Sequence, residues 1–377
     1  MTSTVHPSPS PRPRGAGAGA YDEVELVVWS GTGNSRRVAE WVAAAARTGG
    51  AATVVRSAPR MEQATDAPAR ALDGADGKDE GPPARRLLGL LGPTHGFTAP
   101  WPVVRAAATT PRVWGVDAFV LMTRGAMRAG RWTLPGFEGT AALLPAALLA
   151  LRGARVRGMG AIDMPQNWTL VIPAAAPAAV AAIVARGEAQ TDAFAARILG
   201  GERAFGGWVQ AAVGAMMLPL SLAYLVIARL VLAKAFYADE SCTSCGACVA
   251  GCPHGAIRLL GPARRPYWTF ACHNCMRCMA RCPKEAIQGA QGWLLFYAYL
   301  AGLPVTAAVM EGIGVSAGWP SVAGRLLVGF GWIVVTVWMA YGLLWLGLGT
   351  PGLRWLLERA TLTRWYRRYR GPGRMEQ

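Results

Sequence analysis

Charged residues are scarce in this 377-residue chain. They make up 16% of it, whereas hydrophobic residues make up 53% and the mean hydropathy is +0.25. This composition excludes a disordered or fibrous chain, which would be poor in apolar residues or strictly periodic. It is also unusual for a purely soluble protein, so membrane segments must be sought. The length favours two or three domains.

Acidic residues are the scarcer of the charged kinds. Lys and Arg number 38 against 22 Asp and Glu, which gives a net charge of +16 and a pI near 10.2. Such a chain is attracted to nucleic acid or to anionic lipid. The Arg-rich end, 354–374, interleaves Arg with Trp and Tyr, as suits the headgroup layer of a cytoplasmic leaflet. No folded basic module accompanies it, so we expect anionic lipid and no nucleic acid.

An apolar leader and scattered cysteines are both missing. Residues 1–20 mix Pro, Ser, Gly and Ala without an apolar core, which predicts a disordered arm rather than a signal peptide or spanning helix.

The eight cysteines are about 2% of the chain, far below the density of a disulfide scaffold. All of them lie between Cys242 and Cys282. So local a cluster indicates metal binding.

Apolar runs alternate with helical patterns between residues 21 and 203. We expect strands at 24–30, 53–56, 87–92, 118–123 and 155–162. We expect helices at 34–47, 101–108, 140–152 and 177–199. This alternation predicts an α/β fold with a doubly wound parallel sheet. The Pro-, Asp-, Glu- and Gly-rich stretch 57–86 is expected to contain a mobile loop.

Two cysteine runs share one spacing. The first is Cys242-x2-Cys245-x2-Cys248-x3-Cys252-Pro253, and the second is Cys272-x2-Cys275-x2-Cys278-x3-Cys282-Pro283. This is the pattern of bacterial two-cluster ferredoxins, in which the fourth cysteine of each run ligates the other cluster. One [4Fe–4S] cluster is therefore expected on Cys242, Cys245, Cys248 and Cys282. The other is expected on Cys252, Cys272, Cys275 and Cys278.

Zinc is the alternative metal for such a cluster of cysteines. A zinc ribbon uses two Cys-x2-Cys pairs separated by a long spacer, rather than triplets followed by Cys-Pro. The spacing therefore favours iron and sulfide. His254 and His273 adjoin ligands, but eight cysteines already fill eight positions, so these histidines are expected beside the ligands or at the surface.

A hydroxyl- and glycine-rich loop follows the first expected strand. It reads Ser30-Gly31-Thr32-Gly33-Asn34-Ser35, at a turn from strand into helix where a phosphate would find amides and hydroxyls. Arg36 occupies the place of the last glycine of a dinucleotide fingerprint, and no Lys-Ser/Thr pair of a nucleotide P-loop is present. Loops of this kind bind the FMN phosphate in flavodoxins, whose strand order 2-1-3-4-5 places the ligand at the carboxyl ends of strands 1 and 3.

Two further loops are expected beside the flavin ring. They contribute Pro93, Thr94, His95 and Gly96 after the third strand, and Thr123, Arg124 and Gly125 after the fourth. His95, Phe97 and Trp101 are candidates for packing on the ring, and ordinary core or helix-start packing is the alternative for each. The sequence shows no nucleophile, acid–base pair or catalytic metal, so no catalytic residue is predicted.

The chain resembles the flavodoxin–ferredoxin fusion family, the EFR-type ferredoxins. The resemblance covers roughly residues 21–290 and is carried by the loop 30–36, the segments 93–97, 164–168 and 236–242, and both cysteine runs. It implies an electron-transfer protein that holds FMN and two [4Fe–4S] clusters. The phosphate would lie on Ser30 to Ser35, with the loops 93–96 and 123–125 flanking the ring.

Three stretches free of charge follow the α/β unit. They are 204–228, 286–310 and 326–353, each long enough to cross a bilayer. We expect 204–228, with Pro219 in it, to form an interfacial or re-entrant element, because a single crossing would separate the two redox domains. Residues 292–310 and 326–348 would form a transmembrane hairpin with Glu311 at the far interface. The basic tail would then return to the cytoplasmic side.

These observations predict a membrane-associated electron-transfer protein with its redox domains on the cytoplasmic side of the cell membrane and with redox partner proteins. The expected parts are an arm (1–20), a flavodoxin-like domain (21–203), an apolar linker (204–235), a small α+β two-cluster ferredoxin domain (236–290), a hairpin (291–350) and a basic tail (351–377). Two alternatives stay open. One is a flavin-dependent reductase that uses His95 or Arg124 on a small substrate, and the other is an iron–sulfur anchor with an empty flavodoxin-like scaffold.

Overall fold

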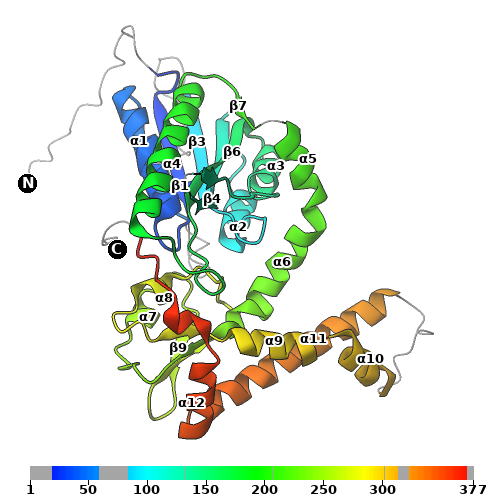
Figure 1. Ribbon diagram of the computed structural model, residues 1–377. Coiled ribbons are helices and arrows are strands. Elements are labelled where there is room, and N and C mark those ends of the chain that lie inside the picture. The colour runs from blue at the N-terminus through cyan, green and yellow to red at the C-terminus, as the bar shows by residue number, and fades with distance from the viewer. Residues whose placement is uncertain are drawn as a thin grey trace, which may run out of the picture.

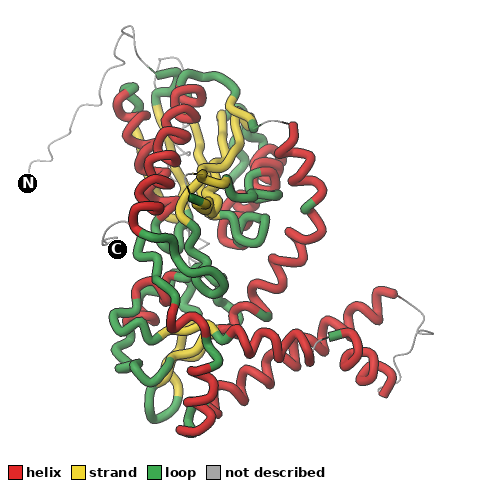
Figure 2. The backbone as a smooth tube through the Cα atoms, in the orientation of Figure 1, coloured by secondary structure: helices red, strands yellow, loops and turns green. Residues whose placement is uncertain are grey.

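The α/β domain occupies the first half of the chain (Figures 1 and 2). The structure, a computed structural model, describes residues 19–58, 84–130, 132–206, 208–300, 302–312 and 322–371. The predicted arm, apart from Gly19 and Ala20, and most of the predicted loop 57–86 lie outside these ranges. The elements are β1 (Glu23–Val28), α1 (Asn34–Thr48), β2 (Ala52–Ser57), β3 (Arg86–Pro93), α2 (Trp101–Thr109), β4 (Asp117–Ala129), β5 (Trp132–Leu134), α3 (Leu143–Leu151), β6 (Arg155–Pro165), α4 (Pro177–Leu199) and β7 (Ala204–Phe205).

The sheet has the order β2-β1-β3-β4-β6-β7, and all of these neighbours are parallel. The first five parallel strands in chain order are thus arranged 2-1-3-4-5, which confirms the flavodoxin-like fold. The sheet also continues past residue 203, because β7 pairs with β6. The sheet thus takes in the first two residues of the predicted linker.

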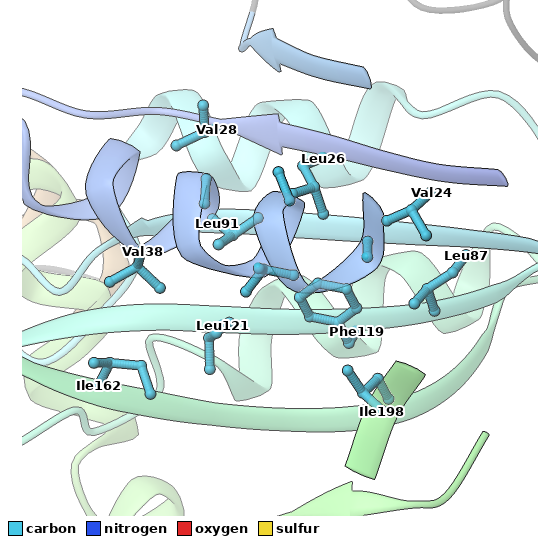
Figure 3. Packing of buried hydrophobic residues seen from close by; sticks show 14 of the residues in the cluster. Val24, Leu26, Val28, Val38, Leu87, Leu91, Phe119, Leu121, Ile162 and Ile198 are labelled. Carbon is cyan, nitrogen blue, oxygen red and sulfur yellow. The ribbon is translucent and has the colours of Figure 1, made fainter. Parts of the chain in front are cut away.

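Side chains of β1 alternate between the two faces of the sheet. Val24, Leu26 and Val28 pack beneath α1, and Figure 3 shows them with Phe119 and Leu121 in one apolar layer. On the opposite face, a second core lies under α2 and α3. Figure 1 shows α1 and α4 on one side of the sheet and α2 and α3 on the other. The chain after β1 and the chain after β3 hence diverge to opposite faces and leave a crevice between them.

The ferredoxin domain is built from two short antiparallel pairs. Its elements are β8 (Phe236–Ala238), α7 (Ala247–Ala250), β9 (Ile257–Leu260), β10 (Arg265–Trp268), α8 (Arg277–Arg281) and β11 (Ile287–Gly289). β8 pairs with β11, and β9 pairs with β10. Phe236, Ile257 and Trp268 form its core together with several of the cysteines.

The apolar linker packs against the α/β domain. It forms α5 (Trp208–Met216), α6 (Leu218–Leu230) and the short 3-10 helix η2 (Leu232–Ala235). The break falls just before Pro219, which occupies the second position of α6, where its missing N–H is harmless. Ser221 donates a hydrogen bond to the carbonyl of Phe97 (2.8 Å), so α6 contacts the loop after β3.

Three helices project from the ferredoxin domain and are called the apolar arm here. They are α9 (Gln291–Leu300), α10 (Leu303–Gly312) and α11 (Val322–Gly347). The first leg of the predicted hairpin, 292–310, is therefore not one helix. Pro304 lies at the second position of α10, where the helix has to restart because proline cannot donate to the preceding turn. Among the described residues, one helical stretch, Leu327–Gly347, is long and apolar enough to cross a membrane.

The described part of the Arg-rich segment, up to residue 371, packs in part on the protein itself, and its contact with anionic lipid stays a prediction. After α12 (Pro351–Arg359) and the 3-10 helix η3 (Leu362–Trp365), the chain runs along the ferredoxin domain to the α/β domain (Figure 1, red). Thr363 and Tyr369 are buried. Arginines of this segment bind protein groups: Arg368 donates to Gln288, and Arg370 pairs with Glu285.

Candidate functional site

The loop after β1 leads into an uncapped helix. Gly33 has φ 112°, a left-handed conformation that glycine adopts without strain, and α1 begins directly after it with no side-chain cap. The first amides of a helix have no intrahelical partner, so those of α1 are available to an anion. Ser30 accepts a hydrogen bond from the Gly33 amide (3.2 Å), and Ser35 bonds the Thr123 hydroxyl (2.9 Å).

The carboxyl ends of β1, β3, β4 and β6, with the residues that follow them, enclose one cleft. The space between these segments is about 370 Å³, a figure that includes open solvent at the mouth. The cleft is lined by Ser30, Gly31, Thr32, Asn34, Ser35, Pro93, Thr94, His95, Thr123, Arg124, Gly125, Met164, Pro165, Asn167 and Cys275. The hydroxyl of Thr94 is buried there without a hydrogen-bond partner among the described residues.

Most of the sequence-predicted flavin-site residues line this cleft, but four candidates do not. Gly33 is not among the lining residues, and Gly96 faces α6, where an added Cβ would collide with the Tyr224 ring. Phe97 and Trp101 are also absent from the lining. The sequence analysis missed the contributions of β6 and of Cys275 to the cleft. A local sequence pattern does not show which distant strands pair or which domains are in contact.

Arg124 is fully engaged by carboxylates. It donates to the buried Asp163 (2.8 Å) and pairs with Glu138 (3.4 Å). Asp163 also accepts from Gln190 (3.0 Å). Burial raises the pKa of Glu138, which the Arg124 charge partly offsets. Arg124 therefore acts as a structural clamp between β4 and β6, and this arrangement does not favour its use on a small substrate.

Trp29 and three of the four histidines in the sequence meet between the two domains. The indole of Trp29 donates to the ring of His254 (3.2 Å) and packs edge-on against His95. His254 in turn packs edge-to-face against His273, with ring centroids 4.3 Å apart. Burial lowers the pKa of His95 to about 4 and that of His273 to about 3, so both rings are neutral near pH 7. Trp29 was not predicted, since a strand-end Trp looks like ordinary core.

The eight cysteines fall into two spatial groups. One cavity is shared by the group that we call the distal set: Cys242, Cys245, Cys248 and Cys282. In this set, the pKa of Cys248 is raised to about 11 by burial and then by Cys242 and Cys282. The other group is the proximal set, Cys252 with the second run. Burial, and to a smaller extent Cys252, raises the pKa of each member of that run: Cys272, Cys275 and Cys278.

Both cysteine runs have the same backbone conformation. Ser244 and Asn274, which precede the second cysteine of each run, have φ near +54° (53° and 55°). Gly246 and Met276, which follow it, are also left-handed. These turns direct amides inward: Asn274 donates to the sulfur of Cys272 (3.5 Å), and Ala256 donates to that of Cys252 (3.3 Å). Hydrogen bonds to sulfur are among the factors that set the potential of a cluster.

No group of three or more His, Cys, Asp or Glu side chains among the described residues is arranged to hold a metal ion. In a zinc site all four ligands lie about 2.3 Å from one ion. The distal thiols instead surround a cavity lined by mostly apolar groups. Four thiols around one cavity fit the four-thiolate ligation of a cubane of iron and sulfide.

A buried lysine lies close to the proximal set. Lys234 is 1% exposed, and its ammonium group lies over the rings of Tyr267, Phe270 and Tyr341, at 4.3–4.7 Å from their centroids. Burial lowers its pKa to about 8, while Cys272 acts in the opposite direction. Tyr341 belongs to α11, so the apolar arm completes this cage.

The cleft and the proximal set meet at Gly31 and Cys275. A Cβ on Gly31 would lie 2.5 Å from the carbonyl oxygen of Cys275 and 2.9 Å from its Cβ. Cys275 therefore belongs both to the lining of the cleft and to the proximal thiols. We call the distal and proximal sets together the cysteine knot. The cleft and the cysteine knot are two neighbouring parts of one site.

Comparisons with known proteins agree with the cysteine pattern. Residues 241–287 match the 4Fe-4S dicluster domain family. A solved flavodoxin from the domain Archaea is similar at 12% identity over 45% of this chain and 97% of that chain, with a TM-score of 0.25. No curated protein matches the chain. The chain thus carries a 4Fe-4S dicluster ferredoxin domain next to an α/β domain whose own strand order is flavodoxin-like.

Proposed function

We propose that this protein transfers electrons between FMN, held in the cleft of the α/β domain, and two [4Fe–4S] clusters held by the distal and proximal sets. The observation that carries the proposal is Cys275, a residue of the cysteine knot that also lines the cleft. When bound, the flavin exchanges electrons in pairs or singly, and the clusters exchange them singly. The fusion-family resemblance supports the same assignment.

The side of the cleft formed by the loop 30–35 and the start of α1 is polar and suits a phosphate ester. The uncapped N-terminus of α1 offers free amides, and Ser30, Thr32 and Ser35 supply hydroxyls around them. Thr94 has a buried hydroxyl that lacks a partner among the described residues, and a bound polar group would satisfy it. His95, whose lowered pKa keeps it neutral near pH 7, would offer an uncharged ring to a flat ligand.

The cysteine knot suits clusters because most of its thiols are at least partly shielded from water, with Cys272 buried. In the absence of metal, the raised pKa of Cys275, about 11, keeps its thiol protonated at neutral pH. Iron would displace that proton, so cluster assembly and folding of the domain are coupled. The proximal thiols are more deeply buried than Cys245 of the distal set, which is exposed. The distal set is therefore the side that a redox partner protein would reach.

Metal and flavin content test the proposal directly. Protein prepared without oxygen is expected to contain about eight iron and eight sulfide per chain, since two cubanes need that number. It should also release about one FMN on denaturation. Zinc or disulfides in place of iron would overturn the cluster assignment. Full iron content without any capacity to bind FMN would instead favour an empty scaffold in the α/β domain.

We further propose that the apolar arm attaches the protein to a membrane. Large apolar side chains on α11 remain exposed, among them Leu327, Trp338, Leu343 and Leu346. The second half of α11, from Thr336 on, packs against the ferredoxin domain. The part before Thr336 is about 21 Å long at 1.5 Å per residue, less than the roughly 30 Å of a bilayer core. The arm would thus enter the membrane with the ferredoxin domain at its surface.

Charges placed on the arm should release the protein from lipid. The double variant Leu327→Glu/Phe330→Glu changes two exposed residues of α11 before Thr336. It is expected to bind vesicles of mixed neutral and anionic lipid at least about 100-fold more weakly, because a carboxylate in the hydrocarbon costs about 2.5–3.5 kcal/mol. Flotation of vesicles measures this. The matched control is Phe137→Glu/Leu151→Glu, which changes two exposed apolar residues of the α/β domain. Equal flotation of both variants would contradict membrane attachment through the arm.

A further inference from the structure

The last described residues of the chain lie against the phosphate loop. Tyr369 is 5% exposed, and its hydroxyl donates to the side-chain oxygen of Asn34 (2.5 Å). The amide nitrogen of Asn34 donates to the carbonyl of Pro165 (2.9 Å). Both ends of this side chain are therefore fixed, one by β6 and the other by the chain terminus. Gly371 lies so close to Thr32 that an added Cβ would collide with the Thr32 carbonyl oxygen.

The segment that carries Tyr369 is itself firmly held by the ferredoxin domain. The hydroxyl of Thr363 accepts from the amide of Gly289 (2.9 Å) and donates to Gln288 (2.9 Å). Arg368 donates to the same Gln288 (2.8 Å). The neighbouring Arg367 exchanges hydrogen bonds with the main chain of Ala174 in the α/β domain. The segment 361–371 consequently spans both domains, and we call it the C-terminal strap.

The strap supports the loop from behind and does not occupy the cleft. Neither Tyr369 nor Gly371 is among the residues that line the cleft, whereas Asn34 and Thr32 are. The strap also leaves the first amides of α1 without a side-chain cap. A plug would place its own groups on those amides. The contact with the Asn34 side chain instead orients a residue of the loop.

We infer that the C-terminal strap is part of the ligand site: Tyr369 fixes Asn34, and thereby the loop 30–35, in the conformation that binds the phosphate ester of the ligand. Tyr369 is in this sense a positioning residue, since it touches the loop and not the ligand. The inference rests on the proposed function, because it takes a phosphate ester as the ligand of the cleft. It adds a dependence of that site on the far end of the chain.

The test is FMN affinity in the full-length protein. Tyr369→Phe removes one hydroxyl from a buried hydrogen bond, and we expect FMN to bind about 3- to 10-fold more weakly. Gly371→Val should weaken binding further, since it forces the strap away from Thr32. Titration of flavin fluorescence gives the affinity. Iron content and thermal unfolding, measured on the same samples, show whether each variant is folded.

Tyr366→Phe is the matched control, because it removes a hydroxyl from the same strap three residues earlier. Its FMN affinity should equal that of the unaltered protein. Unchanged affinity in Tyr369→Phe and Gly371→Val would overturn the inference while leaving FMN binding intact. Tighter binding in either variant would also overturn it, since the strap would then be a plug. If the unaltered protein itself binds no FMN, the proposed function fails instead.

Discussion

Cys275→Ala is expected to reduce the iron content from about eight to about four or fewer per chain, and to stop electron exchange between the flavin and the remaining cluster. The loss of iron follows from removing one of four thiolates of a cubane. The loss of exchange follows from position, because Cys275 is the thiol that lines the cleft. Iron analysis, electron paramagnetic resonance and single-turnover reduction of the flavin measure both effects.

Cys245→Ala is the matched control for this variant. Cys245 belongs to the distal set and is exposed, so its loss should reduce iron to a similar extent. Flavin in this variant should still exchange electrons with the remaining cluster, which lies beside the cleft. Undiminished iron in Cys275→Ala would contradict the ligand assignment. Equal loss of flavin exchange in both variants would contradict the order in which the two clusters are placed.

Gly31→Ala should slow electron exchange between flavin and clusters by about 5- to 150-fold without changing the iron content. The added methyl group meets the carbonyl oxygen and the Cβ of Cys275 at 2.5 and 2.9 Å, and neither atom can swing away like the end of a flexible side chain. Overpacking of this kind costs about 1–3 kcal/mol. This cost would lower the fraction of molecules in which the two domains are in close contact by about 5- to 150-fold.

Stopped-flow reduction at saturating FMN measures the effect, so that a weaker flavin affinity does not confuse the result. Gly352→Ala makes the same change on α12, where an added Cβ meets nothing within 4 Å. It should leave the exchange rate unaltered. A normal rate in Gly31→Ala would show that electron exchange between the flavin and the clusters does not depend on the contact between Gly31 and Cys275.

Local patterns predicted the α/β domain well because its signals are local. Buried parallel strands read as continuous apolar runs, as in β3, and the turn at Ser30–Ser35 follows β1 where expected. Spacing alone also predicted which cysteines lie together, since three thiols two residues apart have to share one loop. The strand lengths were less accurate: β4 extends to Ala129 because it pairs with β5 and with the end of β6.

Features that depend on distant contacts were predicted poorly. The composition of the Arg-rich end did not show that Arg368 and Arg370 have partners in the ferredoxin domain. Composition shows that a segment is basic and does not show which carboxylates and carbonyls lie opposite. Trp29 and Cys275 were underestimated for the same reason, because their importance arises from the packing of one domain on another.

The cage around Lys234 has a practical consequence for anyone who wishes to shorten the protein. Tyr341 of α11 covers the ammonium group and also accepts from the amide of Trp268 (3.1 Å). Cutting the chain after residue 290 to obtain a more soluble fragment would strip that cover away, leaving a cation and the aromatic core open to water. The apolar arm is thus also part of the core of the ferredoxin domain. Purification of the full chain in detergent is therefore preferable to truncation.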